Sequence, residues 1–216
     1  MKKKGTVCII FGILGLIIFV LYTLFIMRYD VQAIGPKGSK VGLASINLMV
    51  REIIGTHKIW YHITEYFGIV AVFTVVAFAI TGLVEAIQRK SLLKVDKEIY
   101  LLGGFYIVVI ACYIVFEKVI INYRPVLEDG KLEASYPSSH TILIMCVMAS
   151  AFIELKRIME KGIVRNILLF FIILIMIVTV VGRLICGVHW FSDIVGGMLL
   201  SLALIIFYKG LTLKIK

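Results

Sequence analysis

The chain has 216 residues, of which 61% are hydrophobic and only 17% charged, and its mean hydropathy is +1.04. Soluble domains are about 45–50% apolar and about 25% charged, so this composition excludes an ordinary soluble enzyme and indicates an integral membrane protein. The net charge of +10 does not indicate a nucleic-acid-binding protein, because the basic residues lie in short clusters between apolar runs. That distribution is typical of membrane proteins with positively charged loops on one side.

Six apolar stretches predict an all-α, polytopic membrane protein with a bundle of six transmembrane helices. The expected spans are residues 7–27, 67–87, 99–120, 138–155, 164–183 and 190–208. Backbone groups have no water partner in lipid, so only helices and closed barrels cross a bilayer, and long runs without alternation favour helices. The first run has 21 residues from Val7 to Met27 and ends in no small-residue cleavage site, which predicts an uncleaved span instead of a signal peptide. We expect residues 1–216 to form a single membrane domain.

One long loop, residues 28–66, separates the first two spans. Its second part, Ile46–Ile63, mixes apolar and polar residues and predicts a helix that lies in the membrane interface. Trp60 and Tyr61 would then lie at the level of the lipid headgroups.

The distribution of basic residues predicts the orientation of the chain in the membrane. If the N-terminus is cytoplasmic, most of the 23 Lys and Arg residues fall in cytoplasmic segments. Positive charges are enriched in cytoplasmic loops, so we expect both termini in the cytoplasm and the loop of residues 28–66 outside.

Three polar segments border the apolar runs: Lys118–Pro125 (KVIINYRP), Tyr136–His140 (YPSSH) and Arg183–Asp193 (RLICGVHWFSD). Ionisable groups at membrane depth are costly and mark functional sites by default. With the expected topology, all three segments lie on the extracytoplasmic side. Their cationic, hydroxyl and imidazole groups are suited to binding a phosphate and attacking it.

The third polar segment contains a possible nucleophile. His189 and Asp193 are four residues apart and share a face if the segment is helical. A carboxylate bonded to one imidazole nitrogen leaves the other free as a nucleophile or base. Arg183 has the planar donor geometry that binds phosphate oxygens in pairs. The alternative is a buried structural His–Asp pair, with Arg183 reaching to lipid headgroups.

The other two polar segments contain groups that could bind and protonate a phosphate. Ser138 and Ser139 precede an apolar run, where a helix start offers free N–H groups to an anion, and His140 follows in the first turn. Lys118 and Arg124 add two cations near the end of the third span. Ordinary helix capping and anchoring at the membrane interface are the alternatives for these residues.

Together the three segments resemble the type 2 phosphatidic acid phosphatase (PAP2) superfamily, which shares its site with vanadium-dependent haloperoxidases. The family pattern is Lys-x6-Arg-Pro, then Pro-Ser-Gly-His, then Ser-Arg-x5-His-x3-Asp. This chain departs from it at three positions. Gly182 replaces the leading Ser, Ser139 replaces Gly, and Lys118 stands one residue late, with Glu117 in the expected position.

The resemblance implies a role for each matching residue. His189 would attack phosphorus and form a phosphohistidine, with Asp193 orienting the ring. His140 would protonate the leaving oxygen and then activate water. The implied phosphate-binding residues are Arg124, Arg183, Lys118, Ser138 and Ser139. We expect no metal ion and no other cofactor, because fixed cations and a helix N-terminus can stabilise the phosphoryl group and no carboxylate cluster lies near the segments.

The expected function is therefore that of a lipid phosphate phosphatase acting at the outer face of a cell membrane. Undecaprenyl pyrophosphate is the favoured substrate, followed by phosphatidate and phosphatidylglycerophosphate. Two alternatives use the same residues: a lipid phosphotransferase with the same intermediate, and a non-catalytic protein that binds or transports lipid phosphates. Simple anion binding needs cations but neither an oriented nucleophile nor an acid, so His189 and His140 favour an enzyme.

Overall fold

The computed structural model describes residues 2–215, and this part of the chain contains seven α-helices and no strand. The helices are α1 (Lys2–Ile26), α2 (Ala44–Ile54), α3 (Ile59–Gln88), α4 (Lys97–Lys118), α5 (Ser139–Ile158), α6 (Ile163–Ile185) and α7 (Phe191–Ile215). Two short 3-10 turns, η1 (Pro36–Gly38) and η2 (Leu92–Lys94), lie between them. The predicted all-α class is confirmed.

Five of these helices are long and apolar enough to cross a membrane, namely α1, α3, α4, α6 and α7. The remaining expected span, residues 138–155, corresponds to α5, which packs against α3, α4, α6 and α7 in the interior of the bundle. Its C-terminal turns carry the buried carboxylate of Glu154, which accepts hydrogen bonds from Tyr208 and Arg157. Six crossings remain a prediction.

The loop between the first two long helices differs from the expected one. The helix within it, α2, ends at Ile54, because Gly55 takes a left-handed φ of 72°. α3 then begins at Ile59, well before the predicted start at residue 67. Trp60 and Tyr61 therefore belong to the first turn of α3 and not to a separate interfacial helix. Polar residues in the first two turns of α3 obscured the helix in the hydropathy pattern, and three of them, Tyr61, Thr64 and Glu65, lie in the site described below.

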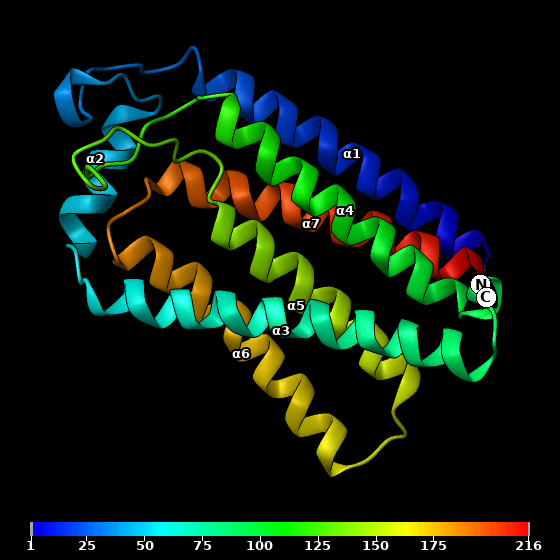
Figure 1. The fold of residues 1–216 in the computed structure, drawn as a ribbon. Helices are drawn as coiled ribbons and strands as arrows, with labels where there is room; N and C mark the ends of the chain where they lie inside the picture. Colours follow the sequence, from blue (N-terminus) through cyan, green and yellow to red (C-terminus); the bar gives the residue numbers. More distant parts are fainter. Residues whose placement is uncertain (1, 216) are drawn as a thin grey trace.

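The helix pair α1 and α7 packs closely along most of its length (Figure 1). Glycines allow the close approach: a Cβ added to Gly12 would lie 2.7 Å from the Cβ of Phe207. Likewise, a Cβ added to Gly5 would lie 2.9 Å from the carbonyl oxygen of Gly210. Without a hydrophobic force between helices in lipid, such small residues give the van der Waals contact that holds helices together.

The two longest loops, residues 27–43 and 119–138, lie at one end of the bundle (Figure 1). This end contains α2, the loop between α4 and α5, and the turn between α6 and α7, whereas α1 begins and α7 ends at the opposite end. The three polar segments thus lie on one side, as expected. The assignment of that side to the outside of the cell remains a prediction.

Candidate active site

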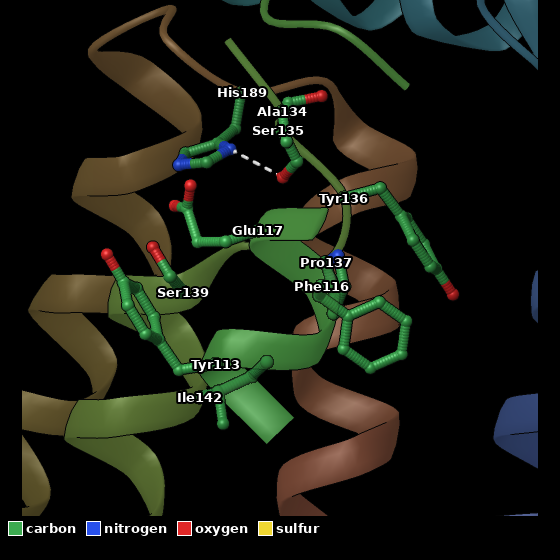
Figure 2. Close-up of a pocket in the computed structure, with 10 residues that line it drawn as sticks. All are labelled: Tyr113, Phe116, Glu117, Ala134, Ser135, Tyr136, Pro137, Ser139, Ile142 and His189. Atoms are coloured by element: carbon green, nitrogen blue, oxygen red, sulfur yellow. Dashed lines mark hydrogen bonds between the residues drawn. The ribbon is translucent and has the colours of Figure 1, made fainter. Parts of the chain in front are cut away.

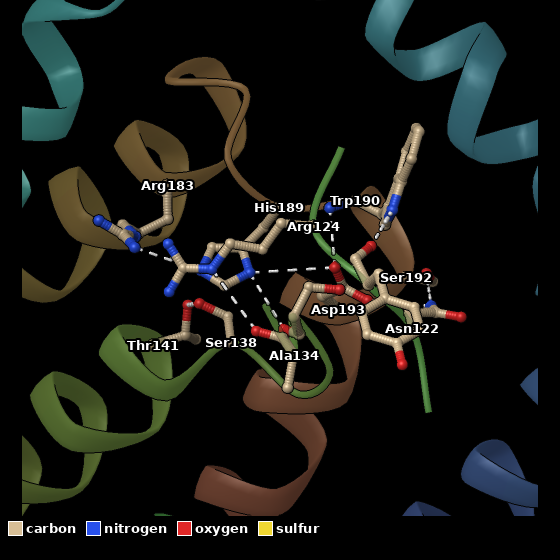
Figure 3. Close-up of polar contacts among 12 residues, drawn as sticks. Asn122, Arg124, Ala134, Ser138, Thr141, Arg183, His189, Trp190, Ser192 and Asp193 are labelled. Carbon is tan, nitrogen blue, oxygen red and sulfur yellow. Dashed lines mark hydrogen bonds and ion pairs between the residues drawn. The ribbon is translucent and has the colours of Figure 1, made fainter. Parts of the chain in front are cut away.

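The second and third polar segments meet in the interior, and Arg124 from the first approaches them (Figure 3). Four of the expected residues are almost completely buried: Ser138, Arg183 and Asp193 have no exposed surface, and His189 is 3% exposed. Charged side chains are rarely buried unless they are paired. The hydrogen-bond partners of these residues therefore indicate how each side chain is oriented and where its protons lie.

His189 lies in the turn between α6 and α7, and both of its ring nitrogens have partners. Nδ1 lies 3.1 Å from the carbonyl oxygen of Ser135 and Nε2 lies 3.2 Å from Nη2 of Arg183 (Figures 2 and 3). A carbonyl only accepts hydrogen bonds, so Nδ1 carries the proton and Nε2 keeps its lone pair. Burial and the nearby guanidinium groups of Arg183 and Arg124 hold the pKa of His189 well below its ordinary value. The imidazole is therefore neutral, as a nucleophile must be.

Asp193 does not hold the imidazole as the sequence predicted. Its Oδ2 lies 3.9 Å from Nδ1 of His189, which is too far for a hydrogen bond. Instead, Oδ2 accepts from the backbone N–H of Trp190 at 2.8 Å and Oδ1 accepts from Nδ2 of Asn122 at 3.1 Å. The carboxylate thus fixes the start of α7 and the turn that carries His189. A carbonyl from the loop before α5 takes the orienting position, which residue spacing could not reveal.

Arg183 is held by residues from the beginning of α3. Its Nη1 lies 3.2 Å from Oε1 of Glu65 and 3.4 Å from Oγ1 of Thr64, and its guanidinium lies 5.4 Å from the ring centre of Tyr61. These three residues were not predicted as site residues. Of the three, Glu65 could have been recognised from the sequence, because it is a charged residue at the start of an apolar run.

His140 lies in the first turn of α5, and its Nε2 is 3.0 Å from Oε1 of Glu65. Ser138 stands one residue before this helix. Its N–H donates to the carbonyl of Asp193 at 3.1 Å, and its Oγ accepts from Oγ1 of Thr141 at 3.0 Å. These bonds fasten the second polar segment to the third.

Arg124 is paired with carboxylates of its own loop. It contacts Glu128, and its Nη2 lies 3.6 Å from Oε2 of Glu133. Its Nε donates to the carbonyl oxygen of Ala134 at 3.5 Å. The loop between α4 and α5 therefore folds around this arginine.

The structure does not bring Lys118 to the other site residues. Lys118 and the preceding Glu117 are both exposed at the end of α4, and Glu117 also lines a small cavity of about 20 Å³ together with His189 and Ser139 (Figure 2). One position in a helix is a rotation of about 100°. The one-residue shift in the motif thus places a carboxylate where the family pattern has a cation.

An apolar cavity of about 340 Å³ adjoins the site between α4 and α5. Its apolar wall includes Val109, Ile110 and Leu143, and its polar lining includes Glu117, Arg124, Ser139 and His140. Such a cavity can hold an apolar chain while its headgroup contacts Arg124.

Two asparagines connect the loop of residues 28–58 to the start of α7. Asn122 accepts from the N–H of Gly42 at 3.1 Å while it donates to Asp193. Asn47 donates to Oγ of Ser192 at 3.0 Å and accepts from its N–H at 3.0 Å. Neither asparagine was predicted, because a single amide side chain has no distinctive sequence signal.

Within residues 2–215, no group of three His, Cys, Asp or Glu side chains is arranged to hold a metal ion.

Comparisons with known proteins place this geometry in context. Residues 115–215 match the PAP2 superfamily. Among solved structures, the chain is similar to the first transmembrane PAP2 type phosphatidylglycerolphosphate phosphatase from Bacillus subtilis, with a TM-score of 0.58 and 18% sequence identity. The similarity covers 95% of this chain and 97% of that one. No curated protein matches the sequence. The match over residues 115–215, which contain all three polar segments, and the fold shared with a transmembrane PAP2 type phosphatase show that this chain is similar to the PAP2 superfamily.

Proposed function

We propose that this protein hydrolyses the terminal phosphate of a membrane lipid through a phosphohistidine at His189. The observation that carries the proposal is the pair of contacts made by its ring: the proton is held at Nδ1 by Ser135, and the unprotonated Nε2 lies beside Arg183. The lone pair of Nε2 accepts from Arg183 in this structure, and once the phosphoryl oxygens take over that guanidinium, the neutral imidazole can attack the phosphorus atom.

The reaction has two steps. Nε2 of His189 forms a bond to phosphorus as the bond to the leaving oxygen breaks, and His140 gives a proton to that oxygen. Water then attacks phosphorus with His140 as the base, the N–P bond breaks, and inorganic phosphate leaves. Arg183 and Arg124 stabilise the charge on the phosphoryl oxygens, together with the N–H groups near Ser138 and Ser139. The exposed position of Lys118 does not favour a role in this binding.

Two observations support a lipid as the substrate. The apolar cavity between α4 and α5 ends at Arg124 and His140, so a lipid chain in the cavity would bring its headgroup to the site. The similar solved structure is named as a phosphatase of phosphatidylglycerolphosphate, which is a lipid phosphomonoester. The candidates are thus undecaprenyl pyrophosphate, phosphatidate and phosphatidylglycerophosphate, presented from the outer side of the membrane with both termini in the cytoplasm.

The test is phosphate release by the purified protein from each of these three lipids, with added acceptor alcohols in a parallel series. We expect free phosphate from at least one lipid. If phosphorylated acceptor exceeds free phosphate, the protein is a phosphotransferase with the same intermediate. If the protein binds the lipids but releases and transfers no phosphate, it is a binding or transport protein and the proposal is wrong.

A further inference from the structure

The carboxylate of Glu65 contacts two groups of the proposed reaction at once. Its Oε1 lies 3.0 Å from Nε2 of His140 and 3.2 Å from Nη1 of Arg183. In the proposed mechanism, His140 donates a proton to the leaving oxygen while Arg183 binds the phosphoryl group. A single anionic oxygen that contacts both therefore lies close to the position of the leaving oxygen. On the proposed mechanism, Oε1 of Glu65 thus lies where we expect the leaving oxygen.

The carboxylate can leave this position, but its charge stays near the site. The Glu65 side chain is 40% exposed, so it can turn aside when a substrate enters. Its backbone is fixed in the second turn of α3, where the neighbouring Thr64 is completely buried and donates to the carbonyl oxygens of Trp60 and Tyr61. When a substrate is bound, the carboxylate of Glu65 therefore remains close to its leaving group.

We infer that Glu65 is a specificity-determining residue that selects lipid phosphomonoesters over lipid pyrophosphates. This inference rests on the proposed function. In both substrates the N–P bond forms at His189 and one P–O bond breaks. From a monoester, the leaving oxygen takes the proton of His140 and departs as an uncharged alcohol. From a pyrophosphate, the leaving group is a lipid phosphate that is itself an anion, and Glu65 repels it. Like charges placed together in a partly buried site are strongly unfavourable.

Three other carboxylates around the site favour the same choice. Glu117 lines the cavity of His189, and Glu128 and Glu133 contact Arg124. The lysine of the family pattern would add a positive charge, but Lys118 is exposed elsewhere. On another side of His189, Arg51 lines a second small cavity, and its Nη1 donates to the carbonyl oxygen of Gly187 at 3.1 Å.

The experiment compares two substrates with the same hydrocarbon tail, farnesyl phosphate and farnesyl pyrophosphate. The measured quantity is the ratio of kcat/KM for release of the first phosphate, in the wild-type protein and in Glu65→Gln. We expect the substitution to shift this ratio toward the pyrophosphate by about tenfold or more, because it removes the repulsion at similar side-chain size. Glu52→Gln is the matched control, since Glu52 is an exposed carboxylate on α2, and it should leave the ratio unchanged. Glu65→Ala is a second uncharged variant in case Glu65→Gln does not fold.

An unchanged ratio in a folded, active Glu65 variant would overturn this inference while the phosphatase assignment stands. Loss of activity on both substrates would also overturn it, because Glu65 would then be required for the reaction itself. Failure of the wild-type protein to release phosphate from both farnesyl compounds would overturn this inference, and only failure on the three lipids named under the proposed function as well would overturn that function.

Discussion

Nδ1 of His189 lies 3.1 Å from the backbone carbonyl oxygen of Ser135, and this contact joins the turn before α7 to the loop before α5. Because the acceptor is a main-chain atom, its position depends on the path of the loop and not on the side chain of residue 135. The orientation of the proposed nucleophile is therefore a property of how two polar segments pack together.

Replacement of His189 by alanine should abolish phosphate release, with a loss of at least about 1,000-fold in kcat, because no other group can form the intermediate. Incubation with a 32P-labelled lipid phosphate should label the wild-type protein with an acid-labile phosphate and leave the variant unlabelled. His57→Ala is the control, because His57 is an exposed histidine at the same end of the bundle. Retained turnover in a folded His189→Ala protein would exclude the mechanism.

Substitution of Asn122 by alanine should lower both stability and turnover. The change leaves Oδ1 of Asp193 and the N–H of Gly42 without their partners, at a cost of about 1–3 kcal/mol for each buried group. The misplaced turn should reduce kcat more than it raises KM, since His189 is displaced. The midpoint of thermal unfolding in detergent and the steady-state kinetics measure the two effects. The exposed Asn166→Ala should change neither, and equal behaviour of the two variants would contradict the supporting role of Asn122.

Lys118→Ala should have a much milder effect than Arg183→Ala. Lys118 is exposed, whereas Arg183 is buried and lies 3.2 Å from the proposed nucleophile. We expect a loss of at most a few-fold for the lysine variant and at least about 100-fold for the arginine variant. Phosphate release under identical conditions measures both. Similar losses would show that the flexible lysine reaches the phosphate despite its shifted position.

Activity should be unaffected by EDTA and should not rise when Mg²⁺ or Mn²⁺ is added. The reaction as proposed uses arginines, a histidine acid and backbone N–H groups to stabilise the phosphoryl charge. The assay is phosphate release from the best lipid substrate after dialysis against chelator. A loss of activity that is restored by a divalent cation would contradict this expectation.

The orientation in the membrane can be tested by cysteine labelling. A thiol introduced at Asp129, between α4 and α5, should react with a membrane-impermeant reagent added to intact cells, because this exposed residue lies at the end of the bundle that contains the site. A thiol at Lys161, between α5 and α6, should react only after the membrane is opened. The reverse pattern would overturn the predicted orientation.

The fold was largely predictable because apolar runs determine where helices form in a membrane protein. The predicted helix boundaries were wrong where polar residues belong to a helix. One example is the start of α3, where Thr64 and Glu65 contact Arg183 of another helix. A hydropathy pattern treats such residues as a loop. It cannot distinguish a polar group that faces water from one that is paired inside the bundle.

The site was only partly predictable. The sequence motifs identified Arg183 and His189, which the structure brings within 3.2 Å of each other. The partners Glu65, Ser135 and Asn122 could not be predicted, because their contacts depend on how separate segments pack in three dimensions. The spacing of His189 and Asp193 predicted a direct bond that does not form, since the carboxylate bonds to Trp190 and Asn122 instead.

The bonds between Asn47 and Ser192 have a consequence for how related proteins diverge. Asn47 and Glu65 both lie before residue 115, outside the region that matches the superfamily, yet one fixes the start of α7 and the other contacts Arg183 and His140. Two members can therefore share every motif residue and still differ in the residues that hold and surround them. If Glu65 acts as we infer, substrate preference can change during evolution through the N-terminal half of the chain, while the proposed catalytic residues in the C-terminal half stay the same.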